Sequence, residues 1–197
     1  MKSSKEKRDL LLKTKPHVRK AVLFEDGRYA EDMGLLWASY KRGGFPALPK
    51  TFDEHIFTDV ILNHAKDYDS LWIIEDDSKV FKSGRGPVAF VGVKLRDGGW
   101  AMEPHVEWFA WASPRAILRG SVAFFQMVRY SKDVGVCVVR SLKKHANLFY
   151  RLKDYGVLFY CGKIPKGDFR GDEYIFSVNG KKNGHEVAKM IEIEATV

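Results

Sequence analysis

Residues 106–125, VEWFAWASPRAILRGSVAFF, join an apolar run to an amphipathic helix, and this junction decides the fold. Ser113 followed by Pro114 indicates a helix start, because Ser is a preferred N-cap residue and Pro suits the first helical position. Apolar side chains then recur with helical spacing as far as Tyr130. The stretch therefore predicts a strand over Pro104–Ala112 that leads directly into a helix over Pro114–Tyr130.

The sequence on both sides of this junction alternates between strand-like and helical patterns. On the N-terminal side we expect strands over His17–Phe24, Ser70–Glu75 and Gly86–Leu95, a helix over Tyr29–Lys41, and a second helix that a Thr51–Glu54 capping box opens and that ends near Lys66. On the C-terminal side we expect strands over Val134–Val139, Val157–Cys161 and Tyr174–Val178, with a helix over Leu142–Tyr155 closed by Gly156. The segment His185–Val197 fits either a short helix or a strand.

This order of elements predicts a single layered sheet. The last three strands before Pro114, from Ser70 to Ala112, suggest an antiparallel meander, and the strand–helix–strand segment after them suggests a right-handed crossover between parallel strands. One sheet covered by helices is an α/β or α+β sandwich. We therefore expect a mixed, mainly antiparallel central sheet with helices on both faces.

The positive charge of the chain gathers at its N-terminus. Residues 1–20 hold eight Lys or Arg against Glu6 and Asp9, a balance of +6 out of the formal net charge of +8. We therefore divide the chain into a basic tail, residues 1–16, and a single domain, residues 17–197. The tail is either solvated or makes nonspecific contacts with nucleic acid or an acidic protein surface.

The rest of the composition is that of an ordinary globular protein, with 45% hydrophobic and 13% aromatic residues. No apolar run approaches the roughly 18 residues that a membrane span needs, so we expect no membrane contact. The only apolar stretch near the N-terminus is Leu10–Leu12, which is too short for the core of a signal peptide. Cys137 and Cys161 fit reduced core thiols of a cytosolic protein.

The element order over residues 17–180 resembles the GCN5-related N-acetyltransferase (GNAT) family. Glu25-Asp26 and Tyr29 before the helix of Met33, Leu36 and Trp37 resemble its first strand and helix, Val106–Ser113 before the Pro114–Tyr130 helix resembles its cofactor-binding core, and His145–Gly156 resembles its last core helix. The stretch 106–125 also resembles small GNAT-like proteins of tailed bacteriophages, some of which are virion-associated.

This resemblance implies two alternative functions. One is an N-acetyltransferase that uses acetyl-CoA and works in the cytoplasm, which is the host cytoplasm if the protein is phage-encoded. The other is a non-catalytic GNAT-fold protein of the virion, or one that contacts a host protein, because a fold can persist after its site is lost.

The predicted cofactor site lies at the helix start, where free N–H groups favour the pyrophosphate of acetyl-CoA. The N–H groups of Arg115 to Ile117 would meet this anion, with help from the guanidinium of Arg115 or Arg119. Family members carry a glycine-rich loop here, which Ser113–Ser121 does not match, so the alternative is a plain capped helix with two surface arginines. The candidate cofactor-binding residues are Trp111, which fits the core equally well, Ser113, Arg115, Ala116, Ile117, Arg119 and Asn147.

Glu107 is the candidate catalytic base. Glu103, His105 and Glu107 alternate along one strand and share a face with Phe109 and Trp111. A carboxylate among aromatic side chains has a raised pKa, which suits a base near neutral pH. The alternative is that Glu107 pairs with a Lys or Arg. Same-strand spacing supplies too few converging ligands for a metal, and we expect none.

The candidate catalytic acids are Tyr150 and Tyr155. The resemblance places the family's acidic Tyr four residues before the Gly that closes the last core helix, and Leu152 stands at that position. The two nearby tyrosines either take over this role or are ordinary packing residues of an amphipathic helix.

Overall fold

The computed structural model describes residues 3–11, 16–130, 134–142, 146–168 and 171–179. Its helices are α1 Ser4–Leu11, α2 Glu31–Lys41, α3 Glu54–Ala65, α4 Pro114–Tyr130 and α5 Ala146–Asp154. Its strands are β1 His17–Lys20, β2 Phe24–Glu25, β3 Arg28–Tyr29, β4 Ser70–Asp77, β5 Arg85–Arg96, β6 Ala101–Trp108, β7 Val136–Leu142, β8 Phe159–Asp168 and β9 Gly171–Asn179. In this part of the chain, no helix is both long and apolar enough to cross a membrane.

A mixed, mainly antiparallel sheet with the hydrogen-bonded order β1-β4-β5-β6-β7-β9-β8 organises the fold, as the sequence predicted. β1 with β4, β4 with β5, β7 with β9 and β8 with β9 are antiparallel, and β6 with β7 is parallel. The chain divides into two compact units. We call residues 15–94 and 105–120 the β4 unit, and residues 1–14, 95–104 and 121–197 the β9 unit.

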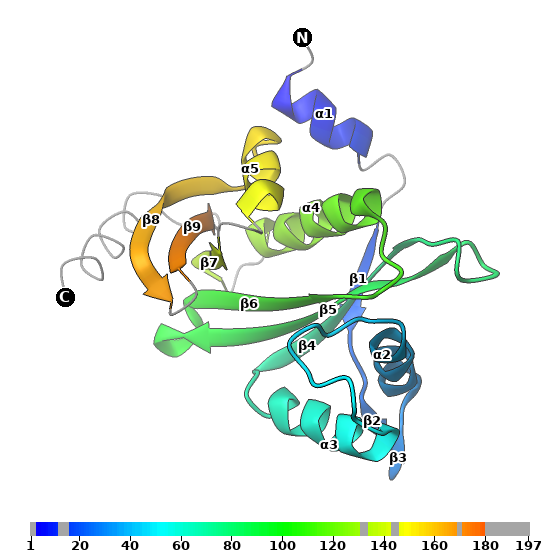
Figure 1. Cartoon of the computed structure of the whole chain (residues 1–197). Coiled ribbons are helices and arrows are strands. Elements are labelled where there is room, and N and C mark those ends of the chain that lie inside the picture. The colour runs from blue at the N-terminus through cyan, green and yellow to red at the C-terminus, as the bar shows by residue number, and fades with distance from the viewer. Residues whose placement is uncertain (1–2, 12–15, 131–133, 143–145, 169–170, 180–197) are drawn as a thin grey trace. The chain divides into compact units, whose positions relative to one another are not determined.

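In the β4 unit, helices cover both faces of the sheet. α2 and α3 lie on one side and the start of α4 on the other (Figure 1). Ile73 and Phe90 belong to the core shared with α2 and α3. The next residue, Ile74, points to the opposite face, because strand side chains alternate. There α4 comes so close that a Cβ added at Gly120 would lie 2.9 Å from the Cγ2 of Ile74.

The β9 unit is built on an antiparallel ladder of seven residue pairs between β7 and β9, which β8 extends. α5 packs on it through Phe149 and Phe176, whose ring centroids are 5.5 Å apart. α5 is closed, as predicted, by Gly156, which has a φ of 67° and donates its N–H to Lys153 O, while the N–H of Val157 donates to Leu152 O. These two bonds form a Schellman motif.

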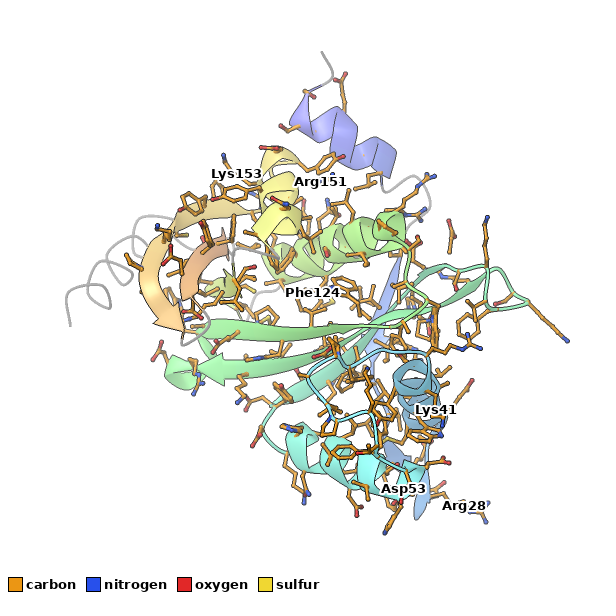
Figure 2. All side chains as sticks on the ribbon, in the orientation of Figure 1. Arg28, Lys41, Asp53, Phe124, Arg151 and Lys153 are labelled. Atoms are coloured by element: carbon orange, nitrogen blue, oxygen red, sulfur yellow. The ribbon has the colours of Figure 1, made fainter. Side chains whose placement is uncertain are left out.

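The predicted bounds of several elements were wrong. The N-cap of α3 is Asp53, not Thr51, because Asp53 Oδ1 accepts the Ile56 N–H at 2.8 Å; Figure 2 shows Asp53 at this helix start. β6 ends at Trp108 rather than Ala112, since Phe109 begins a turn in which the Ala112 N–H donates to its carbonyl. Leu142 belongs to β7 and not to α5.

Two other segments differ from the expected pattern. β8 and β9 extend to Asp168 and from Gly171, so most of the predicted loop between Cys161 and Tyr174 is a hairpin. The expected first strand stops at Lys20, and Phe24 to Tyr29 form a separate β2–β3 hairpin. The basic N-terminal stretch contains α1, and its Ser4 Oγ donates to Asp154 O at 2.9 Å. His185–Val197 lies outside the described residues.

Candidate functional site

The start of α4 is a capped helix end with few unused donors. Ser113 Oγ accepts the N–H of Ala116 at 3.2 Å, and Ser113 O accepts the N–H of Ile117 at 2.9 Å. The prediction that Ser113 caps the helix and that Pro114 opens it is confirmed. The same two bonds use two of the three N–H groups proposed for the anion, which leaves the N–H and the exposed guanidinium of Arg115.

Arg119 does not lie on the surface, where either interpretation of the sequence had placed it. Its Nη2 lies 2.7 Å from Asp76 Oδ1 and its Nη1 lies 3.0 Å from Asp77 Oδ2, and its side chain is 3% exposed. The charge of this guanidinium is therefore balanced inside the β4 unit. The sequence around Arg119 could not predict this ion pair, because its acidic partners lie on β4, far away along the chain.

Trp111 is held by packing and by one hydrogen bond. Its Nε1–H donates to Pro87 O at 2.7 Å, and its ring lies 5.0 Å from that of Phe109 and 5.6 Å from that of Phe81. The Arg42 guanidinium stands 5.4 Å from the ring centroid, within cation–π range. Trp111 thus packs against the hydrophobic core of the β4 unit as a half-buried residue.

Glu107 lies in an apolar pocket of the β4 unit. Phe45, Leu48, Ile61, Tyr68 and Phe90 line this pocket together with Glu107, and His64 stands at its exposed rim. Desolvation raises the pKa of the half-buried Glu107 carboxyl above its ordinary value. No other residue that the structure describes forms an ion pair or a hydrogen bond with this carboxylate. The alternative interpretation, a pairing of Glu107 with a Lys or Arg, is therefore not what the described residues show.

The other two members of the predicted trio have partners. Glu103 Oε2 lies 3.7 Å from Arg96 Nη2 in the β9 unit. In the β4 unit the exposed ring of His105 lies 5.4 Å from that of Tyr68. Alternation along one strand correctly predicted that Glu107 and Phe109 face the same core. It did not reveal Phe45 or Tyr68, because both come from loops with no periodic signal.

The α5 candidates belong to the β9 unit. Asn147 is exposed and Tyr155 is half-buried. Tyr150 sits in an aromatic cluster with Tyr160 and Phe176, at centroid distances of 5.6 and 5.2 Å. Desolvation, and then a hydrogen bond with Tyr150, raise the pKa of Tyr160. The catalytic roles of Tyr150 and Tyr155 and the binding role of Asn147 stay predictions.

Leu152, at the position that the resemblance gives to the acid, is fully buried. Its side chain packs in the core of the β9 unit, and its carbonyl takes part in the Schellman motif. A buried Leu supplies no proton, so this position has become structural.

Similarity to solved structures decides the fold. The ribosomal alpha-N-protein acetyltransferase RimL, in complex with coenzyme A, superimposes with a TM-score of 0.61 over 86% of this chain and 97% of its own, at 9% identity. A ribosomal-protein-S5-alanine acetyltransferase from Vibrio fischeri gives a TM-score of 0.59 over 85% and 94%, at 11% identity. A probable GNAT-family acetyltransferase from Chromobacterium violaceum gives 0.57 over 84% and 83%, at 16% identity. The protein has a GNAT fold.

This likeness is one of architecture, since no family model and no curated protein matches the sequence. The GNAT fold by itself does not fix a reaction, because folds host many functions and function belongs to the site. Within this GNAT fold, the β4 unit carries two features that could serve in binding or catalysis. They are the Glu107 pocket and the α4 start at Ser113 and Arg115.

Proposed function

We propose that the protein is an acyl-CoA-dependent N-acyltransferase in which Glu107 is the proton acceptor. The observation that carries this proposal is an accessible carboxylate, without a partner among the described residues, in a pocket walled by apolar side chains. A general base works best when its pKa lies near the operating pH, and desolvation raises the pKa of Glu107 toward that pH. The GNAT fold of the solved acetyltransferases supports the same reaction class.

The chain's part in the reaction follows from this carboxylate. An amine reaches the protein mainly as an ammonium ion, which has no lone pair for attack. Glu107 accepts one proton from it, so that the neutral amine becomes the nucleophile and the carboxylate becomes a carboxylic acid. Acetyl-CoA, when bound, supplies the acyl group as a thioester. With the thioester bound, the new N–acyl bond would replace the C–S bond, and the second proton lost by the attacking nitrogen would pass to the departing thiolate, which leaves as a thiol.

The α4 start fits one phosphate group better than a pyrophosphate cradle. The helix end is positive, the N–H of Arg115 is not used by Ser113, and the Arg115 guanidinium is exposed. Ser113, Arg115, Ala116 and Ile117 are the residues that would hold the anion there. The N–H groups of Ala116 and Ile117 already donate to Ser113, and these bonds compete with a bound phosphate. We therefore expect weaker phosphate binding than a glycine-rich loop gives.

The decisive experiment is calorimetry with acetyl-CoA, followed by a turnover assay with a panel of amines. We expect acetyl-CoA to bind and Glu107→Gln to keep that binding while it lowers kcat/KM at least a hundredfold, the usual scale for a positioned base. Glu103→Gln, on the same strand but outside the pocket, is the matched control and should keep its activity. No binding at millimolar acetyl-CoA, or full activity of Glu107→Gln, would overturn the proposal.

A second candidate function is a non-catalytic GNAT-fold protein that acts through a protein partner, of the virion or of a host cell. Two observations favour it: Leu152 is fully buried where the family's acid would stand, and Ser113 caps the helix that would bind the cofactor. Absence of turnover together with a stable complex of defined stoichiometry would support this function. Acetyl transfer to any free amine would reject it.

A further inference from the structure

The Glu107 pocket is small and has an exposed rim. Its volume is about 190 Å³, below the range of roughly 300–1,000 Å³ that is usual for ligand sites. Phe45, Ile61 and Phe90 are buried and form its inner walls, whereas Ala47 and His64 are exposed at its rim. A ligand of this pocket is therefore a small molecule that enters past Ala47.

The lining carries one carboxylate. Glu107 is its only acidic member, and no described residue neutralises it. A ligand ammonium would supply the missing counter-charge, while the rings of Phe45, Tyr68 and Phe90 would surround an apolar body. A second ammonium in the same ligand would meet these aromatic walls without a second carboxylate. The pocket therefore selects against polyamines, because a desolvated charge without a partner is costly.

The walls are held in place before any ligand arrives. Tyr40 anchors the loop that carries Phe45, since its hydroxyl donates to Pro49 O and accepts the Phe52 N–H at 3.0 Å. Phe45 itself has a φ of 53°, a left-handed conformation that non-glycine residues seldom adopt. Such conformations persist only where the surroundings enforce them. The Phe45 ring packs nearly perpendicular to the Phe57 ring, with 5.5 Å between their centroids, and this contact helps to hold Phe45 in place.

The opposite wall depends on a glycine. Tyr68 lies against Gly92 of β5, where an added Cβ would come within 2.7 Å of the Tyr68 ring. The Nζ of Lys94 lies 5.4 Å from the centroid of the Tyr68 ring, so the ring has Gly92 and Lys94 as neighbours. A preorganised pocket loses little conformational entropy when a ligand binds. Even the few contacts of a small ligand can then suffice for binding.

We infer that this pocket binds a small primary amine with a single charged nitrogen and an apolar, ring-sized body, and that such an amine is the acyl acceptor. The acceptor role rests on the proposed function, whereas the binding does not. The juxtaposition that carries the inference is Glu107, without a partner among the described residues, against Phe45, Tyr68 and Phe90.

The test measures binding to the full-length protein by calorimetry without acetyl-CoA. The probes are phenethylamine, 2-phenylethanol as its neutral counterpart, spermidine, and a short peptide with a free N-terminal alanine. We expect phenethylamine to bind at least tenfold more tightly than each of the others. Glu107→Gln and Ala47→Trp, which blocks the exposed rim, should each lose that binding, and Glu103→Gln should keep it.

The outcomes separate this inference from the proposed function. Binding of phenethylamine without any acyl transfer supports the pocket and contradicts the acyltransferase. Acyl transfer to spermidine or to the peptide, with no phenethylamine binding, supports the acyltransferase and overturns the substrate class. Equal binding of 2-phenylethanol also overturns the inference, because the carboxylate would then have no role in recognition.

Discussion

Arg119 of α4 and Asp76 of β4 form an ion pair of 2.7 Å between Nη2 and Oδ1, with side chains that are 3% and 2% exposed. Burial raises the pKa of Asp76, and the nearby guanidinium opposes this shift. The second oxygen, Oδ2, is buried without a hydrogen-bond partner among the described residues. The pair thus fixes helix and strand together in the β4 unit, yet it is not fully satisfied.

Breaking this pair should strongly destabilise the protein. We expect Arg119→Met or Asp76→Asn to lower the free energy of unfolding by about 3–5 kcal/mol, because each change leaves a buried group without its partner. Urea denaturation followed by circular dichroism measures the effect. The control is Arg115→Met, an exposed position on the same helix, with a change within about 0.5 kcal/mol. Additive losses in the double variant would show that the two residues do not act as a pair.

Glu107→Gln should stabilise the protein at neutral pH, although it removes the proposed base. The pKa of Glu107 is raised in the folded state, so the folded protein binds more protons than the unfolded chain between the two pKa values. Its contribution to stability therefore falls as the pH rises through that interval. The melting temperature of Glu107→Gln should exceed that of the wild type at about pH 7.5 and approach it at about pH 4. A constant difference across the series would contradict this explanation.

Ser113 offers a way to separate the helix cap from the anion site. Ser113→Ala removes the oxygen that accepts the Ala116 N–H and should cost about 1 kcal/mol of stability, whereas Ser113→Gly should cost a few tenths. Both changes free the same donor at the start of α4. If the helix start holds a phosphate of acetyl-CoA, calorimetry should show tighter binding in both variants. Unchanged or weaker binding would place the cofactor elsewhere.

Gly92→Ala should distort the Glu107 pocket. The new methyl group meets the Tyr68 ring, which has to move, and we expect a loss of about 1–3 kcal/mol and at least tenfold weaker binding of phenethylamine. Gly34→Ala is the matched control, because an added Cβ at this exposed position of α2 meets nothing within 4 Å. That change should raise the stability by about 0.4–1 kcal/mol.

The fold was predictable because its decisive signals are local. Ser113-Pro114 and Gly156 mark helix ends by chemistry that acts within one turn, and the structure has both ends there. The Thr51 capping box failed because Asp53, two residues later, is an equally good acceptor and reaches the Ile56 N–H. Sequence alone does not decide between two cap residues that lie so close together.

The site was less predictable because its partners are distant in the chain. Strand alternation placed Glu107 beside Phe109, but Phe45 and Tyr68 come from loops far from it in the sequence. Arg119 looked like a surface residue because Asp76 lies more than forty positions away. Likewise, no local pattern predicts that Gly120 lies against β4, where an added Cβ would come within 2.9 Å of Ile74 Cγ2.

The bond from Ser4 to the last carbonyl of α5 affects how the basic stretch should be probed. Deleting the first residues of the chain would remove positive charge and, at the same time, the Ser4 hydroxyl that donates a hydrogen bond to Asp154 O. Any loss of nucleic-acid binding in a truncated protein would therefore mix electrostatics with a frayed helix end. Neutralising the exposed Lys5 while Ser4 is retained separates the two effects, and affinity tags are better attached with this serine left in place.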